Sequence, residues 1–506
     1  MTEPTPPEGT ERLGPRPSGP PPSASLPSSP PPLMRPPQPS TGGLATVDLR
    51  AAATRVLAGN WIGSTIVAAV TLVTAGLLSL IVGLVAKPPD FGIDNSLTLG
   101  AVVVCGVFGA DFFVNGTPQD IGGDSWDFGL SVAAFPLTIT IVAFAVAVLA
   151  FQRMTRDYPT PWPALADALR VALLVALPLL VVSLVLRSDF DELGRGWFAD
   201  AARDLDFGDD STWGSYAAGA FFMPLFTITP VLILACVARR SWWTGRMRAV
   251  VEWVAPVLHG LAAFVALLPV AGVIGVGLLM FGGDRVDEDV DTGDTGAAWA
   301  AIAAFLGNGG LALLGLGAGA DVGTAGREIG DGENSRPTDW HRLGWYAGDG
   351  GDEPGLWAAP LVLLVVLVAS AWVVSRLSVR TTLLRNLLCW AASLLIAVPV
   401  LVRLANGHGT VHLDAGSETY ESSGVMGLEG VQATFFITGI ALLVALALAA
   451  ARGGIDRQVL GALKRLQVDA GRSRSVAAGT MPPPPPPPSG PSPVTPDVPP
   501  PPPPPA

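Results

Sequence analysis

Long apolar runs, separated by shorter polar segments, fill the middle of the chain. Eight of these runs have about the length of a membrane span and cover residues 61–86, 128–151, 168–186, 216–238, 254–281, 355–375, 386–404 and 431–451. A helix rises about 1.5 Å per residue, so about twenty residues cross the ~30 Å hydrocarbon core of a bilayer. The pattern therefore predicts an all-α membrane protein with eight transmembrane helices.

Two further apolar runs are too short or too interrupted to cross the membrane. Residues 97–110 form a run of only 14 residues, which Asp111 ends. Residues 297–320 form a longer run, but Gly307, Asn308, Gly309 and Gly310 interrupt it and divide it into halves of ten. We expect both to be re-entrant or short membrane segments that return to the outer side.

Arginine clusters indicate which way the predicted helices run. They follow the second, fourth, sixth and eighth of these helices, at residues 153–156, 239–248, 376–385 and 452–465. Short cytoplasmic loops collect Lys and Arg. If the two interrupted runs return to the outer side, every cluster and both termini are cytoplasmic, and most acidic residues lie outside. If both runs cross, the first two clusters become external.

Four short sequence marks recur in the same order in the two halves of the chain. Gly109-Ala110-Asp111 matches Gly319-Ala320-Asp321, "AAFPL" at 133–137 matches "WAAPL" at 357–361, "ALPLLV" at 176–181 matches "AVPVLV" at 397–402, and "AFF" at 220–222 matches "TFF" at 434–436. Repeated order at a nearly constant offset is the signature of duplication. We expect parallel repeats at 46–240 and 241–453, related by an axis along the membrane normal.

The overall composition is typical of a membrane protein, whereas the two ends of the chain have a different, proline-rich composition. Half of the 506 residues are apolar and 14% are charged, against about 25% in soluble domains. The Pro-rich tails, 1–45 and 475–506, cannot bury apolar surface, and we expect disorder and a possible protein partner there. The pattern of the segment before the first helix and of residues 454–474 predicts basic amphipathic helices. We expect both to bind anionic lipids of the inner leaflet.

Few polar residues fall where a membrane protein would use them. Asp111 and Asp321 could line an outer vestibule where each re-entrant segment returns; the alternative is that each simply ends a helix at the interface. His259 is the only ionisable residue well within a predicted span, and it could serve a transported proton or ion. The alternative is a neutral histidine bonded within the bundle.

One outer segment has a partial metal-binding pattern. His408, His412 and Asp414 have a spacing similar to half a zinc site, although the same residues suit a solvated loop. Motifs for phosphate binding, zinc proteolysis and nucleophilic hydrolysis are absent from the sequence. We therefore expect no enzyme, no catalytic residues, no cofactor and no nucleic-acid partner.

The overall pattern resembles the streptophobe family, an uncharacterised group of very hydrophobic, multi-pass membrane proteins of streptomycetes. The resemblance rests on "LAGNW" before the first helix, the apolar multi-span core, the acidic outer loops and the proline-rich ends, and it covers roughly residues 45–470. It implies a location in the bacterial cell membrane and carries over no site residues.

Two classes of function follow from the pattern. Parallel repeats, re-entrant segments and proline-bearing helices favour a transport- or channel-like protein with a cavity between the repeats. The lack of polar groups at mid-membrane and the long proline-rich tails favour a scaffold or envelope-interaction protein. A water-filled interface between the halves would distinguish the first class from the second.

Overall fold

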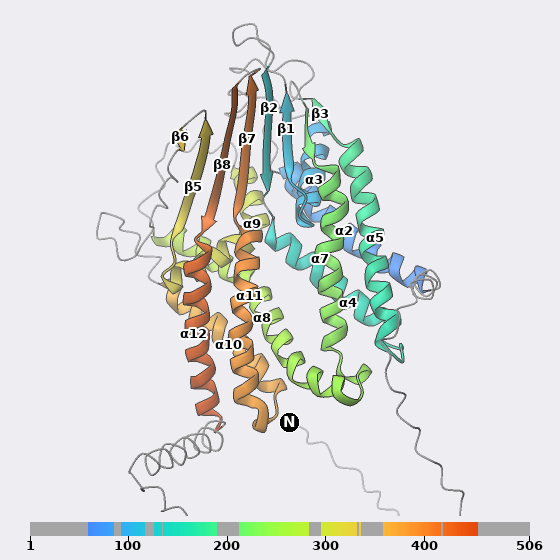
Figure 1. The fold of residues 1–506 in the computed structure, drawn as a ribbon, viewed down its shortest axis with the longest axis vertical. Helices are drawn as coiled ribbons and strands as arrows, with labels where there is room; N and C mark the ends of the chain where they lie inside the picture. Colours follow the sequence, from blue (N-terminus) through green and yellow to red (C-terminus); the bar gives the residue numbers. More distant parts are fainter. Residues whose placement is uncertain are drawn as a thin grey trace, which may run out of the picture. The chain divides into compact units, whose positions relative to one another are not determined.

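Helices and strands occupy separate parts of the molecule, with the strands gathered beyond one end of the helices (Figure 1). The computed structural model describes residues 59–85, 93–116, 126–133, 135–189, 212–282, 295–330, 333–334, 358–415 and 418–453. The predicted proline-rich tails and the two predicted interfacial helices lie outside these residues, apart from the last few residues before the first helix.

The helices match the predicted runs. They are α2 (Trp61–Val85), α3 (Ile93–Val107), α4 (Leu137–Met154), α5 (Pro161–Val185), α7 (Ala217–Ala238), α8 (Gly245–Gly282), α9 (Thr295–Ala318), α10 (Ala359–Leu377), α11 (Leu383–Ala405) and α12 (Gly430–Ala451), with short 3-10 turns at Arg240–Trp242 and Arg380–Thr382. Within the described residues, all of these helices except α3 are long and apolar enough to cross a bilayer. The chain is therefore a multi-pass membrane protein in its composition and helix lengths.

Helix packing follows the rule for membranes, with small residues inside and large ones outside. In α2 the buried side chains include Ser64, Ala68, Thr71, Ala75 and Ser79. The exposed side chains of the same helix are large and apolar: Ile62, Ile66, Val70, Val73, Leu77 and Ile81. Small residues let helix backbones approach closely, while lipid accepts the large apolar side chains without cost. The surface of the bundle is thus suited to hydrocarbon.

The strands form a single antiparallel sheet that the all-α prediction omits. They are β1 (Phe112–Gly116), β2 (Trp126–Ala133), β3 (Ser188–Asp189), β4 (Thr212–Ser215), β5 (Val322–Gly330), β6 (Glu333–Asn334), β7 (Gly407–Ala415) and β8 (Glu418–Leu428). Their order in the sheet is β3-β4-β1-β2-β7-β8-β5-β6. Every strand except β2 comes from a segment that the sequence predicts to be an outer loop, whereas most of β2 lies in residues predicted to begin the transmembrane run 128–151, and that part of the prediction is wrong.

The described elements follow the same order in each half of the chain. The first half contains α2, α3, β1, β2, α4, α5, β3, β4 and α7; the second contains α8, α9, β5, β6, α10, α11, β7, β8 and α12. The sheet repeats this correspondence, because β3-β4-β1-β2 and β7-β8-β5-β6 are the same order of equivalent strands. Strands β2 and β7 join the two sets, from Trp126↔Ala415 to Ala133↔His408.

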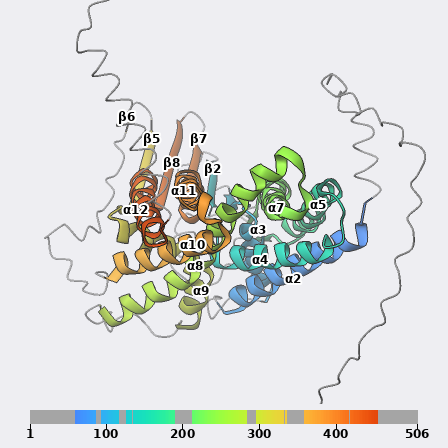
Figure 2. The same ribbon diagram turned by 90° about the horizontal axis from the view of Figure 1, so that it is seen from below.

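The helices divide into two apolar cores that follow the halves. Figure 2 shows α8 to α12 gathered on one side and α2 to α7 on the other. The larger buried cluster draws its residues from α8 to α12 and β8, and the second cluster draws its residues almost entirely from α2 to α7. Ala304 of α9 belongs to the first half's cluster, and Ile141 of α4 packs against the second half's cluster. Helices α4 and α9 therefore connect the two halves.

The predicted interruption of residues 297–320 is wrong, because α9 is one continuous helix. Two of the interrupting glycines, Gly307 and Gly310, serve close packing. A Cβ atom on Gly310 would lie 1.9 Å from the carbonyl oxygen of Leu268 in α8, and one on Gly307 would lie 2.8 Å from Cβ of Leu137 in α4. Glycine permits backbones to approach this closely, so the same residues that suggest a break instead mark a helix contact.

Helices α3 and α9 both lie along the level where helices meet the sheet. In α3, the hydroxyl of Thr98 is 2.7 Å from that of Ser188 in β3, and the carbonyl of Val107 accepts a hydrogen bond from Thr140 in the first turn of α4. In α9, Gly307 lies against the start of α4, and Gly317 lies against Ala359 at the start of α10. These contacts place at least the second part of α9 beside helix ends on the sheet side.

Candidate functional site

The repeated Gly-Ala-Asp tripeptides end α3 and α9 in the same way. Gly109 and Gly319 have positive φ angles of 104° and 92°. The N–H of Ala110 donates a hydrogen bond to the carbonyl oxygen of Cys105, and that of Ala320 donates to the carbonyl oxygen of Gly315. The N–H of each glycine donates to the carbonyl oxygen of the residue three positions earlier. This is the Schellman arrangement, in which glycine takes the left-handed position after the last helical turn. The left-handed backbone conformation therefore explains why each tripeptide begins with glycine.

The two aspartates occupy equivalent backbone positions. The carbonyl oxygen of Asp111 accepts a hydrogen bond from the N–H of Tyr216, at 3.0 Å, and that of Asp321 accepts one from the N–H of Glu429, at 2.8 Å. Tyr216 and Glu429 immediately precede α7 and α12, which end their respective halves. The backbone of Asp111 thus links the end of α3 to the start of α7, and that of Asp321 links the end of α9 to the start of α12.

The side chain of Asp321 has local partners. Its Oδ2 accepts a hydrogen bond from Nε2 of Gln432 at 3.1 Å, and Oε1 of Gln432 accepts one from the N–H of Asp321. Glu429 caps α12 by accepting from the N–H of Gln432. These contacts fix the first turn of α12, which is a structural role for Asp321.

Asp111 faces a different environment, at the seam between the halves. Phe112 pairs with Val132, and Ala133 pairs with His408, so Asp111 and His408 flank the small residue Ala133 across three strands. Burial raises the pKa of Asp111, and the positive charges of Arg403 and His408 oppose that rise. The structure therefore gathers a carboxylate, a guanidinium and an imidazole from both halves at the base of the sheet.

Tyr216 completes this cluster, which we call the seam cluster: Asp111, Tyr216, Arg403 and His408. Burial, followed by the charge of Arg403, lowers the pKa of His408 below its usual value of 6.5. Nε2 of His408 is buried and makes no hydrogen bond among the described residues. Burial and the nearby Asp111 raise the pKa of Tyr216. Because the pKa of His408 is lowered, Arg403 is the main positive charge that acts on Asp111 near neutral pH.

The predicted metal residues do not converge. His408 and His412 lie four residues apart on β7, and in a strand this spacing separates them by about 13 Å. His412 pairs with Gly129 of β2, and Asp414 pairs with Asp127, farther along the same strands. The described residues contain no cluster of three side chains suited to a metal ion.

His259 is exposed on α8 and lies apart from the seam cluster. Its Nδ1 is 2.6 Å from the carbonyl oxygen of Ala255, one turn earlier in the same helix. The neighbouring Gly260 packs against Val374 and Trp390. The structure therefore gives His259 a partner within its own helix and does not bring it to Asp111 or Asp321.

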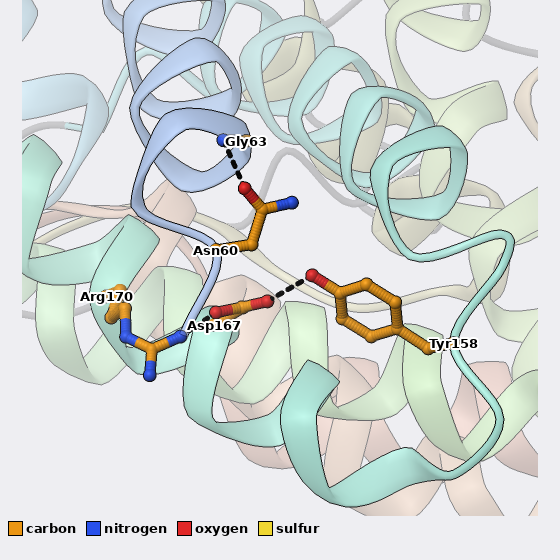
Figure 3. Close-up of polar contacts among 5 residues, drawn as sticks. All are labelled: Asn60, Gly63, Tyr158, Asp167 and Arg170. Atoms are coloured by element: carbon orange, nitrogen blue, oxygen red, sulfur yellow. Dashed lines mark hydrogen bonds and ion pairs between the residues drawn. The ribbon is translucent and has the colours of Figure 1, made fainter. Parts of the chain in front are cut away.

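Sequence reasoning missed a buried ion pair at the other end of the first half. Asp167 and Arg170 lie one turn apart in α5, both essentially buried, and Nη1 of Arg170 bonds to Oδ1 of Asp167. The hydroxyl of Tyr158 donates to Oδ2 of Asp167 at 2.6 Å. Figure 3 shows these three side chains together, near Asn60. The signal in the sequence is an acid and a base three residues apart at the start of an apolar run.

The segment before α2 closes over this ion pair. The guanidinium carbon of Arg170 lies 5.5 Å from the ring centroid of Trp61, a cation–π contact. Gly59 packs on the same guanidinium, and Oδ1 of Asn60 accepts from the N–H of Gly63 at the start of α2. The "GNW" stretch thus fits around a buried charge, and this arrangement is structural, since its members pair with one another.

Asn308 links both halves at the junction with the sheet. Its Nδ2 donates to the carbonyls of Phe135 and Ala405, at 2.9 Å and 2.8 Å, and its Oδ1 accepts from the N–H of Leu137 at 3.0 Å. It therefore satisfies backbone groups at the start of α4 and the end of α11. Such a fully bonded amide fastens helix ends rather than binding a solute.

Comparison with models of known protein families, with curated proteins and with solved structures finds no match to this chain.

Proposed function

We propose that this protein is a membrane scaffold which presents the eight-stranded sheet outside the membrane as a surface for an envelope partner. The observation that carries the proposal is the continuity of the sheet across both halves. Strands of nine to eleven residues, such as β7 and β8, extend about 30–36 Å from the helix ends. A structure of this length is far more than a loop needs to connect two helices.

The topology behind this proposal has eight crossing helices, with α3 and α9 at the junction with the sheet. Arginines stack on tryptophans at the helix ends away from the sheet: Arg239 on Trp242, Arg385 on Trp253, and Arg376 and Arg452 on Trp372. Arg and Trp of this kind are typical of the membrane interface, and Arg favours the cytoplasmic side. The sheet is then external, and both termini are cytoplasmic.

The proposal includes an internal duplication. The identical order of elements in the two halves, the repeated order of strands, and the equivalent positions of Asp111 and Asp321 support it. All elements run in the same sense in both halves, so the repeats are parallel. Duplication explains how a sheet of this width arose: each repeat supplies four strands, and β2–β7 pairing joins them.

Packing between the halves favours the scaffold over the transport-like alternative. Gly307 contacts Leu137, Ile141 packs into the second half's core, and Asn308 is fully hydrogen-bonded. Within the helices that the structure describes, the fully buried acidic and basic side chains are Asp167 and Arg170, and these neutralise each other. A carrier of ions or polar solutes needs polar groups near the bilayer centre.

Cysteine labelling tests the topology and the packing together. In a variant without the native cysteines, single cysteines replace Thr410 on the sheet, Ile141 between the halves, and Arg248 at the opposite end. An impermeant thiol reagent should label Thr410→Cys in intact cells with a permeable wall, label Arg248→Cys only after the membrane is opened, and never label Ile141→Cys. Labelling of Ile141→Cys would support a water-filled transport path, and labelling of Arg248→Cys from outside would overturn the orientation.

Photo-crosslinking tests the scaffold function itself. A photoreactive residue at Thr410, exposed on β7, should give a covalent adduct with one discrete partner in living cells. The same residue at Leu184, a lipid-facing position that is 54% exposed in α5, is the matched control. Failure of Thr410 and further exposed sheet positions to give any protein adduct would refute the scaffold proposal. Membership of the streptophobe family and the absence of enzymatic activity stay predictions.

A further inference from the structure

Two arginines from different helices pack on one indole ring at the ends of α10 and α12. The guanidinium carbons of Arg376 and Arg452 lie 4.8 Å and 4.3 Å from the ring centroid of Trp372. Arg376 is in the last turn of α10, and Arg452 is the residue that ends α12. Both helices run from the side of the sheet towards the opposite end of the bundle, so this group lies at the end away from the sheet (Figure 1).

The structure satisfies these guanidinium groups only in part. Nη1 of Arg452 donates to the carbonyl of Ser375 at 3.2 Å. Neither Arg376 nor Arg452 pairs with a carboxylate among the described residues. Because an arginine carries five N–H donors, most donors of this pair have no partner among the residues that the structure describes, and we expect them to bind a ligand. Two positive charges held against the same ring favour a negatively charged ligand.

The first half shows what a purely structural arginine looks like at the equivalent place. Arg239 ends α7 as Arg452 ends α12, and it stacks on Trp242. Its Nη1 donates a hydrogen bond to the carbonyl oxygen of Thr155 at 2.8 Å, and its Nη2 donates to the carbonyl oxygen of Arg156. Both terminal nitrogens of Arg239 thus bond to the last carbonyls near the end of α4. Arg452 uses only one, so the arrangement in the second half has spare donors.

The exposed face of α10 leads directly to this pair of arginines. Leu361, Val365, Val368 and Trp372 are all exposed, and their spacing places them on one face of the helix. Arg376 continues the same face one turn later and is also exposed. A ligand on this face would therefore meet an apolar stripe along the helix and two guanidinium groups at its end.

We propose that this site binds an anionic phospholipid, with its phosphate between Arg376 and Arg452 and an acyl chain along the exposed stripe of α10. Basic sites between membrane helices are suited to anionic headgroups. The apolar stripe distinguishes a lipid from free phosphate, since only a lipid fills both parts. The site is independent of the sheet and of the scaffold function.

Melting experiments on the purified full chain in neutral detergent test the site. Dioleoyl-phosphatidylglycerol should raise the melting temperature of the natural protein, whereas phosphatidylcholine and inorganic phosphate should not. The double variant Arg376→Gln/Arg452→Gln should lose this rise. Arg246→Gln/Arg248→Gln removes the same charge from exposed positions near the start of α8 and should keep it. An equal rise with inorganic phosphate would indicate a free-anion site and overturn the lipid assignment.

A single substitution keeps the test independent of folding. Arg376 makes no hydrogen bond among the described residues and is exposed, so Arg376→Gln should leave the fold intact. Native mass spectrometry should show at least about tenfold weaker retention of phosphatidylglycerol by Arg376→Gln, because a charge-assisted hydrogen bond is lost. Retention equal to that of the natural chain would refute the proposal.

Discussion

Replacement of Gly310 by alanine tests whether α9 is a continuous helix packed on α8. A Cβ atom at this position would lie 1.9 Å from the carbonyl oxygen of Leu268 and 2.9 Å from the backbone nitrogen of Gly272. Both contacts are with backbone, so no side-chain rotation relieves them. The neighbouring Gly309 is the matched control, because a Cβ atom there meets nothing within 4 Å.

The two substitutions should change the free energy of unfolding in opposite directions. Alanine in place of a helical glycine stabilises by about 0.5–1 kcal/mol, and Gly309→Ala should show this gain. A carbon normally approaches a carbonyl oxygen to about 3.3–3.6 Å, so Gly310→Ala must move α9 away from α8 by more than about 1 Å. Overpacking of this kind costs about 1–3 kcal/mol and exceeds the helical gain.

Unfolding in detergent by titration with SDS, followed by helical circular dichroism, measures the difference. We expect Gly310→Ala to unfold at lower SDS than the natural chain and Gly309→Ala at equal or higher SDS. Gly272→Ala should resemble Gly310→Ala, because its Cβ would lie 1.9 Å from the carbonyl oxygen of Leu306. If Gly309→Ala and Gly310→Ala change the SDS midpoint equally, Gly310 does not form the α8–α9 contact. The interruption predicted from sequence would then regain support.

Three further predictions follow from the described contacts and backbone conformations. Asp167→Leu should cost about 3–5 kcal/mol in the same titration by leaving Arg170 buried without its partner, and the double variant with Arg170→Met should cost less; equal losses would contradict the ion pair. Because the pKa of His408 is lowered in the fold, the unfolded chain binds the proton more readily, so stability should fall as pH drops below about 6.5, and His408→Gln should reduce that fall in pH-dependent melting. Gly319→Ala should cost about 1–2 kcal/mol in the left-handed position and Gly319→Asn less, unless the positive φ is absent.

The transmembrane helices were predictable because the bilayer imposes a length and an apolar surface on each helix separately. Each of the eight predicted runs overlaps one observed helix, although α4 begins at Leu137 because β2 occupies the residues just before it. Arg170 was overlooked for the same local reason, since a position near the end of a predicted run looks interfacial. Its burial depends on Trp61 and Tyr158, which belong to other segments.

The sequence by itself determined where the helices lie, that they suit a membrane, and that Gly-Ala-Asp ends two equivalent segments. Only the tertiary structure decided that segments between the helices form one sheet, because strand pairing depends on partners far away in the chain, as Ala133 and His408 show. It also decided that the glycines of α9 pack against α8, since the same residues suit a break or a close contact. The partners of Asp111 come from the other half for the same reason: charge and burial at a site depend on which segments meet there.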